Sequence, residues 1–245
     1  MTSTTTNSSP DPVAVITGAS SGIGLATAHR LAREGFRTVL VGRTEEALVR
    51  AADTIDGPCT VMPADIGDTA TARAVVTRTV TTLGRIDALI NNAGAAPLVP
   101  IAETTDAHLA ETFRVNAIGP GAMIAEAWPA FRQQRQGVVV NVSTLGTEDP
   151  FPGFFAYAAS KASVNLMTRS CANEGADIGV RAFAVAPGAV ETPMLRGLFS
   201  AEQIPESACL SPDEVAAVIA DCVAGRRDAE NGSVIWLRGP TNTST

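Results

Sequence analysis

The sequence of 245 residues has no apolar run near the roughly 20 residues that a helix needs to cross a bilayer. It also lacks an excess of basic residues. The net charge is −7 and the pI is near 4.9, opposite in sign to the basic surfaces that bind nucleic acid. Hydrophobic residues make up 45% of the chain, an ordinary value for a globular protein. We therefore expect neither a membrane partner nor a nucleic-acid partner.

Metal ligands are scarce as well. The four cysteines are scattered without the C-x-x-C spacing of a metal or redox site, and the only histidines are His29 and His108. We expect no metal, reduced thiols and a cytoplasmic location. Residues 1–11 are rich in serine and threonine but lack the basic start and the apolar core of a signal peptide, so they predict a disordered tail.

Short β-branched runs alternate with longer helical patterns along the whole chain. The runs predict seven strands, at residues 13–16, 38–41, 60–62, 86–90, 138–142, 181–186 and 233–237. The helical patterns lie at residues 23–34, 44–54, 68–83, 104–132, 156–175 and 211–224. Strands that alternate with crossover helices form a parallel sheet covered on both faces. The sequence therefore predicts an α/β fold with a doubly wound, seven-stranded parallel sheet of the Rossmann type.

No linker-like composition interrupts this alternation, so we expect residues 12–240 to form a single domain. The longest stretch without a helical or strand pattern covers residues 187–211. Long irregular loops inside compact domains are commonly functional. We interpret this segment as a flap over a substrate site.

Tyrosine and lysine each occur once, as Tyr157 and Lys161, and every other basic side chain is arginine. Four residues apart in a predicted helix, the two share one face. Arginine does not release its proton, whereas the compact ammonium of lysine can lie beside a phenol and lower the pKa of that phenol. We interpret the pair as catalytic, the alternative being a surface lysine near a packed aromatic ring.

A glycine-rich turn follows the first predicted strand and opens an amphipathic helix. Its sequence from residue 17 to residue 24 is TGASSGIG. Glycine lets the backbone approach a pyrophosphate closely, and a helix N-terminus offers free N–H groups and partial positive charge to an anion. The turn therefore predicts a dinucleotide-phosphate site formed by Gly18, Ser20, Ser21, Gly22, Ile23 and Gly24.

The end of the second predicted strand indicates which dinucleotide is bound. An acidic residue there would hydrogen-bond the adenosine ribose and repel a 2′-phosphate. The chain instead has Arg43 and Thr44, which can pair with a phosphate, and no carboxylate before Glu45. This pattern favours NADP(H) over NAD(H), the alternative being a solvated arginine at the start of a helix.

Five segments in order resemble the short-chain dehydrogenase/reductase family over residues 13–237. They are the glycine turn, the NNAG sequence at residues 91–94, Asn116 within residues 114–116, Tyr157 with Lys161, and Pro187-Gly188 followed by Thr192. The resemblance implies a carbonyl reductase in which the nicotinamide exchanges hydride with a carbonyl carbon while Tyr157 acts as general acid or base. It also implies a homodimer or homotetramer, with the helices at residues 104–132 and 156–175 at the interface.

The same resemblance implies further roles for individual residues. Lys161 would hold the nicotinamide ribose, Asn116 would anchor a water of the proton relay, Asp65 would bond the adenine, and Thr192 would contact the carboxamide. The remaining wall of the cofactor site would consist of Ile66, Asn91, Asn92, Ala93, Gly94, Pro187, Gly188 and Val190.

The catalytic hydroxyl has two candidates. The family usually places a serine 13 residues before the tyrosine, a position that Thr144 occupies here, with Ser143 directly beside it. Adjacent residues of a strand point to opposite faces, so only one should reach the substrate unless the strand has ended. The spacing favours Thr144, and a one-residue insertion before Tyr157 would favour Ser143.

Apolar residues flank the predicted catalytic residues on both sides in the sequence: Phe151, Phe154, Phe155, Met194, Leu195, Leu198 and Phe199. Such a lining indicates a hydrophobic ketone or secondary alcohol as substrate rather than a free sugar. Some of these side chains could equally belong to the core or to a subunit contact.

Two other functions stay open. A 3-oxoacyl-[acyl-carrier-protein] reductase needs a basic docking surface for its acidic carrier. Residues 171–177 are acidic, although Arg132, Arg135 and Arg169 could assemble such a surface. A regulatory protein that senses NADP(H) without turnover would not need the tyrosine, the lysine and the hydroxyl together.

Overall fold

The computed structural model describes residues 11–239. The predicted tail, apart from Asp11, and the predicted domain end at residue 240 therefore lie outside the described residues.

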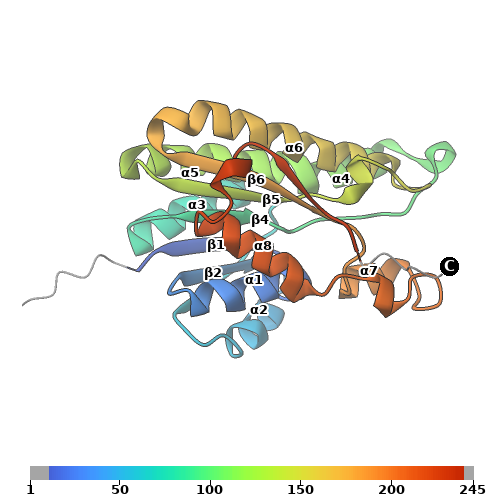
Figure 1. Ribbon diagram of the computed structural model, residues 1–245, viewed down its shortest axis with the longest axis horizontal. Coiled ribbons are helices and arrows are strands. Elements are labelled where there is room, and N and C mark those ends of the chain that lie inside the picture. The colour runs from blue at the N-terminus through green and yellow to red at the C-terminus, as the bar shows by residue number, and fades with distance from the viewer. Residues whose placement is uncertain (1–10, 240–245) are drawn as a thin grey trace, which may run out of the picture.

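Within this range the chain forms one sheet of seven strands, each parallel to its neighbours, in the order β3-β2-β1-β4-β5-β6-β7 (Figure 1). The strands are β1 (Val13–Thr17), β2 (Arg37–Gly42), β3 (Cys59–Pro63), β4 (Ala88–Asn91), β5 (Gly137–Val142), β6 (Val180–Pro187) and β7 (Val234–Leu237). The chain runs outward from β1 to β3 and then returns to the other side of β1, which defines a doubly wound sheet. The predicted fold class is confirmed.

Helices cover both faces of the sheet (Figure 1). One face carries α1 (Gly22–Arg33), α2 (Glu45–Ala52) and α8 (Pro212–Val223). The other face carries α3 (Thr69–Leu83), α4 (Asp106–Phe113), α5 (Gly119–Gln134) and α6 (Phe155–Gly175). Alternate residues of each strand enter opposite cores: Ala14 and Ile16 pack with α1 and α8, whereas Val13 and Val15 pack with α3 and α5.

The single helix predicted at residues 104–132 is wrong, because the structure divides it into three elements. Between α4 and α5 lies a π-helical segment, η2 (Arg114–Ile118), which inserts extra backbone into the helix. Pro120 follows this segment and has no N–H to donate to the carbonyl of Asn116, four residues earlier. Gly119 packs against the loop after β3, where a Cβ atom would lie 2.2 Å from the Ile66 oxygen.

The segment at residues 187–211 is more regular than predicted. It contains α7 (Pro193–Leu198), a 3₁₀ turn at Glu206–Ala208, and a parallel bridge that pairs Val190 with Leu210. Thr192 accepts a hydrogen bond from the Leu195 backbone N–H at 3.2 Å and thereby caps α7, which the irregular composition did not indicate. The segment lies at the carboxyl edge of the sheet, on the right of Figure 1.

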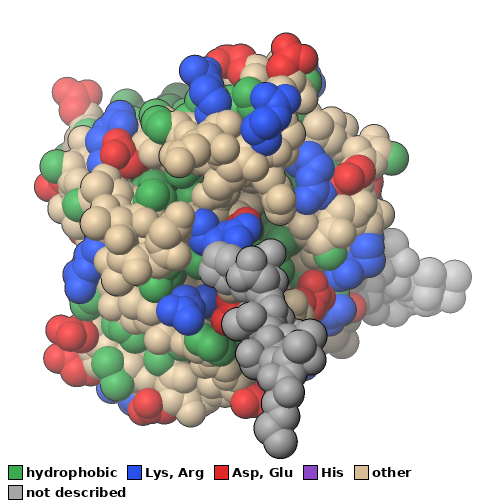
Figure 2. All heavy atoms as spheres, turned by 90° about the vertical axis from the view of Figure 1, so that its left-hand side faces the viewer, with side chains coloured by type: hydrophobic (Ala, Val, Ile, Leu, Met, Phe, Trp, Pro, Cys, Tyr) green, Lys and Arg blue, Asp and Glu red, His purple; other side chains and the backbone are tan. Residues whose placement is uncertain are grey.

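The opposite, amino edge of the sheet faces the viewer in Figure 2, where arginine and acidic side chains are mixed over the surface. Among residues 11–239, no helix is long and apolar enough to cross a membrane. The same residues contain no group of three or more histidine, cysteine, aspartate or glutamate side chains arranged to hold a metal ion.

Candidate active site

A cavity of about 720 Å³ opens at the carboxyl ends of the strands, around the point where the chain order reverses between β1 and β4. It is lined by most residues that the sequence assigned to a cofactor: Gly18, Ser20, Ser21, Gly22, Ile23, Arg43, Thr44, Asp65, Ile66, Asn92, Ala93, Gly94, Pro187, Gly188, Val190 and Thr192. Ser143, Thr144, Tyr157 and Lys161 line the same cavity, whereas Gly24, Asn91 and Asn116 do not.

The glycine turn is packed closely at two of its glycines, Gly18 and Gly24. Gly18 has a φ of 65°, and a Cβ atom there would lie 2.8 Å from Asn92 Nδ2. Gly24 lies in the first turn of α1, where a Cβ atom would approach the Gly18 oxygen to 2.3 Å. Gly24 therefore packs against the turn on the side away from the cavity, whereas Gly18 and residues 20–23 line the cavity.

Thr17 was not among the expected site residues, although it begins the glycine motif. Its hydroxyl accepts hydrogen bonds from the backbone N–H groups of Asn92 and Ala93, at 2.9 and 3.0 Å, and donates to the Ile90 carbonyl. Asn92 Nδ2 in turn donates to the Thr17 carbonyl at 2.9 Å. These bonds join the glycine turn to the loop after β4 and hold both against the cavity.

Asn116 lies fully buried in the π-helical segment behind the cavity wall. Its Oδ1 accepts from the Ala95 N–H at 2.8 Å, and its Nδ2 donates to the Ala95 carbonyl and to Ser160 Oγ, at 2.8 and 2.9 Å. The side chain therefore connects the loop after β4 with the helix of Tyr157. The water-anchoring role implied by the resemblance stays a prediction.

The structure brings Thr144, rather than Ser143, to the phenol of Tyr157. Strand β5 ends at Val142, and both hydroxyls follow it. Ser143 continues the strand pairing, since its N–H donates to the Val185 carbonyl at 2.7 Å, and its own hydroxyl is buried without a partner among the described residues. A hydrogen bond with the Thr144 side chain opposes the rise that burial causes in the pKa of Tyr157. Thr144 is therefore next to the phenol, as the 13-residue spacing predicts.

Burial has the largest effect on the pKa values of Tyr157 and Lys161. It raises the pKa of Tyr157 to about 12, and hydrogen bonding by Thr144 only partly offsets this rise. The expectation of a lowered phenol pKa is therefore wrong for the protein's own side chains. Lys161 is 4% exposed and donates from Nζ to the Val142 carbonyl at 2.7 Å. Burial lowers the pKa of Lys161 to about 8.

Charged side chains gather at the end of the cavity beside β2 and β3. Arg43 is exposed and, among the described residues, has no hydrogen-bond or ion-pair partner. Thr44 precedes α2 without using its side chain as a helix cap, so its hydroxyl is also available. Desolvation would raise the pKa of Asp65, but the Gly67 N–H and the Arg114 guanidinium outweigh it and lower that pKa below its usual value.

Aromatic rings form the opposite end. Phe154 contacts Tyr157, Phe151 and Phe199, with ring centroids 5.1, 5.9 and 6.4 Å apart, each pair in an edge-on arrangement. Met194, Leu195 and Leu198 of the flap also line the cavity, as expected. Phe155, the first residue of α6, does not line it and is 48% exposed.

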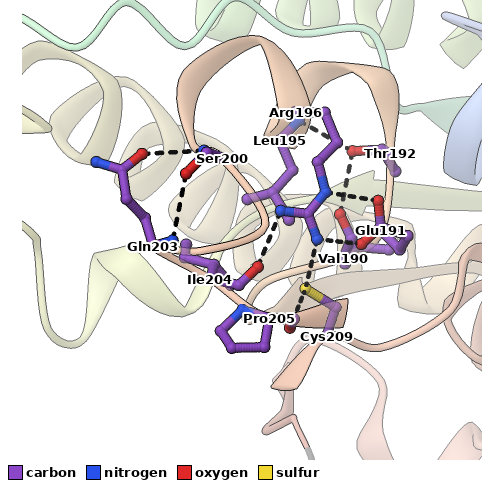
Figure 3. A network of polar contacts seen from close by, with 10 residues as sticks. All are labelled: Val190, Glu191, Thr192, Leu195, Arg196, Ser200, Gln203, Ile204, Pro205 and Cys209. Atoms are coloured by element: carbon purple, nitrogen blue, oxygen red, sulfur yellow. Dashed lines mark hydrogen bonds and ion pairs between the residues drawn. The ribbon is translucent and has the colours of Figure 1, made fainter. Parts of the chain in front are cut away.

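The flap is held together by Arg196, as Figure 3 shows. Its guanidinium forms an ion pair with Glu191 through two nitrogens and donates to the Ile204 carbonyl at 2.9 Å. A third contact reaches Cys209 Sγ at 3.9 Å. One side chain thus connects the start, the middle and the end of the flap.

Comparisons with known proteins agree with this geometry. A sequence profile described as short chain dehydrogenase matches residues 12–203. The chain is 35% identical over 237 residues to a 3-oxoacyl-[acyl-carrier-protein] reductase of Thermotoga maritima, covering 93% of this chain and 96% of the relative. It is 33% identical over 222 residues to an uncharacterized oxidoreductase of Mycobacterium tuberculosis, covering 87% of this chain and 64% of the length of that relative.

Two solved structures are similar throughout. A 3-ketoacyl-(acyl-carrier-protein) reductase from Brucella melitensis, complexed with NADH, superposes with a TM-score of 0.87 at 28% identity, covering 94% of this chain and 97% of that one. A variant of actinorhodin polyketide ketoreductase with NADPH also gives 0.87 at 28% identity, covering 94% and 96%. The chain belongs to the short-chain dehydrogenase/reductase family of oxidoreductases.

Proposed function

We propose that the protein is an NADP(H)-dependent oxidoreductase that interconverts a hydrophobic ketone and its secondary alcohol. The observation that carries the proposal is the meeting of Tyr157, Lys161 and Thr144 in one cavity with the glycine turn. NADP(H), when bound, supplies or accepts the hydride. A regulatory protein that only senses the cofactor would not need these three side chains together.

Each of the three side chains would have its own role at the carbonyl group of a bound ketone. Thr144 and the neutral Tyr157 phenol orient and polarise a carbonyl oxygen, and Tyr157 gives its proton to that oxygen as the alcohol forms. In the reverse direction the phenolate removes the alcohol proton. Lys161, held by the Val142 carbonyl, lines the same cavity, so its positive charge favours the phenolate only against the larger opposing effect of burial on the pKa of Tyr157.

Purified enzyme tests the reaction. NADPH oxidation, followed by absorbance with a panel of aryl and aliphatic ketones, should give turnover with apolar ketones and little with polyols. Binding of NADPH without turnover of any carbonyl compound would support the sensing function instead.

The preference for NADP(H) rests on Arg43, which lines the cavity beside Thr44 where the second strand ends. With no carboxylate at this position, a 2′-phosphate meets a forked guanidinium instead of a like charge. The Arg43→Ala variant should raise KM for NADPH about ten-fold and leave KM for NADH within about two-fold. A wild-type enzyme that prefers NADH would contradict this assignment.

A second candidate is a reductase of 3-oxoacyl groups on acyl carrier protein, because the Thermotoga maritima relative carries that name. The substrate would then reach the cavity on an acidic carrier, past the exposed Arg238, which lines the cavity and is ion-paired with Glu148. The two candidate functions are distinguished by kcat/KM for a 3-oxoacyl group on the carrier protein and for the same acyl group on a short thiol. A much higher value with the carrier protein would support the second candidate. Equal values would assign the enzyme to small free ketones.

We further propose a homodimer or homotetramer in the cytoplasm. Ile118 and Leu166, on the helices expected at the interface, are 51% and 64% exposed. Apolar side chains of this size in contact across a subunit boundary would stabilise association. Light scattering of the wild type and of an Ile118→Glu, Leu166→Glu double variant measures the oligomeric state, and a monomeric wild type would contradict the proposal.

The free thiols of all four cysteines are consistent with a reducing compartment such as the cytoplasm.

A further inference from the structure

Arg114 bridges two carboxylates at the adenosine end of the cavity. Its NH1 donates to Asp65 Oδ2 at 3.0 Å, and its Nε and NH2 donate to Glu111 Oε2 at 3.0 and 2.7 Å. Asp65 Oδ1 accepts from the Gly67 N–H at 3.0 Å, so both oxygens of this carboxylate are held. Asp65 and Glu111 line the cavity, whereas Arg114 stands behind them.

The position of the guanidinium is determined by its surroundings. A Cβ atom at residue 67 would lie 2.7 Å from Arg114 NH1 and 2.8 Å from its Cζ, so a side chain there would shift the guanidinium from this position. Arg114 also begins the π-helical segment, whose Asn116 is anchored by Ala95 and Ser160. The backbone that carries Arg114 is thus fixed from the catalytic side.

The contacts of Arg114 with the two carboxylates should affect how a cofactor binds beside them. An ionised carboxylate only accepts hydrogen bonds, and the exocyclic amine of adenine is a donor, so the orientation of Asp65 decides whether the two can meet. Two negative charges also face a cofactor that carries phosphates. A cation bound to both offsets their repulsion toward that cofactor.

We propose that Arg114 is a positioning residue for the adenine half of the cofactor, acting through Asp65. The inference rests on the proposed function, because it requires that a nicotinamide dinucleotide occupies the cavity. Arg114 differs in this from Arg43: Arg114 is hydrogen-bonded to Asp65 and should affect NADPH and NADH alike, whereas Arg43 acts on Asp65 only through its charge and should mainly affect the 2′-phosphate.

Cofactor binding, measured by fluorescence titration with NADPH and with NADH, tests this directly. The Arg114→Met variant should weaken both cofactors about five-fold, with kcat at saturating NADPH changed by less than about two-fold, and Arg114→Lys should restore part of the loss. Gly67→Ala should act in the same direction with the charge retained, because the new methyl group displaces the guanidinium. In an Asp65→Ala background, Arg114→Met should have less than half of its effect.

Arg226→Met is the matched control. Arg226 also bridges two carboxylates, Asp221 and Glu34, but it lies outside the cavity, so its removal should leave both dissociation constants unchanged. A loss in Arg114→Met confined to NADPH, an undiminished loss in the Asp65→Ala background, or unchanged affinities in both Arg114→Met and Gly67→Ala would overturn the inference. A wild type that binds neither cofactor would instead overturn the proposed function.

Discussion

The two ends of the cavity differ in their physical environment. At the adenosine end, Asp65, Arg114 and Glu111 are partly exposed and hold one another in ion pairs. At the proposed catalytic end, Tyr157 packs against Phe154 and Lys161 is buried, and burial moves the pKa values of both by large amounts. Water screens the first set, so its charges orient a ligand at modest energy, while the low dielectric around the second set amplifies each charge. Under the proposed function, cofactor binding and chemistry therefore take place in opposite environments.

The largest effect should come from removing the catalytic phenol. Tyr157→Phe keeps the ring that packs on Phe154 but takes away the transferable proton, so kcat/KM should fall about 10³-fold. Cofactor titration of the same variant should give a dissociation constant near that of the wild type. Retained turnover would contradict the assignment of Tyr157 and with it the division between the two ends.

Next comes the hydroxyl beside the phenol. Thr144→Ala should lower kcat about 10²-fold, because one donor to the carbonyl oxygen is lost, and Thr144→Ser should recover most of it. Ser143→Ala serves as the matched variant and should cost far less. The opposite ranking would assign the catalytic role to Ser143.

The glycine turn should show an effect on binding rather than on chemistry. A methyl group in Gly24→Ala would overlap the Gly18 carbonyl, and relieving the overlap costs about 2 kcal/mol, or roughly a 30-fold loss of cofactor affinity. Gly35→Ala is a control at a glycine with open space around it, although its positive φ adds some strain of its own. Unchanged affinity in Gly24→Ala would contradict the close packing of the turn.

The pH dependence should separate the two reaction directions. With its pKa raised to about 12, Tyr157 stays protonated at neutral pH, so reduction should be nearly independent of its titration. Oxidation needs the phenolate, whose fraction grows about ten-fold per pH unit below the pKa. The oxidation rate should therefore rise with pH up to about pH 8. Above this pH, Lys161 loses the positive charge that favours the phenolate, so the rise should slow. Oxidation rates that are flat between pH 6 and 8 would show a phenol pKa well below that range.

The smallest effect should come from the flap. Arg196→Met removes the side chain that connects Glu191, Ile204 and Cys209, which should loosen the wall formed by Leu195 and Leu198. We expect KM for an apolar ketone to rise about three-fold while cofactor affinity is unchanged. An equal loss of cofactor affinity would show that the flap serves both ends of the cavity.

Much of the site was predictable because its parts are local patterns. The glycine turn, the Tyr157 and Lys161 spacing, and Arg43 at the end of a strand each depend on neighbours in sequence and on the period of the element that carries them. Thr17 stood inside a recognised motif, yet its role depends on the loop after β4, which begins more than 70 residues later. Arg114 stood in the same recognised segment as Asn116, but nothing in the sequence indicated its role, because Asp65 meets it only through the packing of η2 against the loop after β3.

The sequence by itself therefore determined the parallel sheet, most of the helices that cover it, and the presence of one phenol and one amine at its carboxyl edge. Tertiary structure decided which hydroxyl adjoins the phenol, the insertion at Asn116, and the direction in which the pKa of Tyr157 moves. These properties depend on burial and on contacts between distant segments. Solvent exclusion around a side chain is set by everything packed against it, so no run of neighbouring residues specifies it.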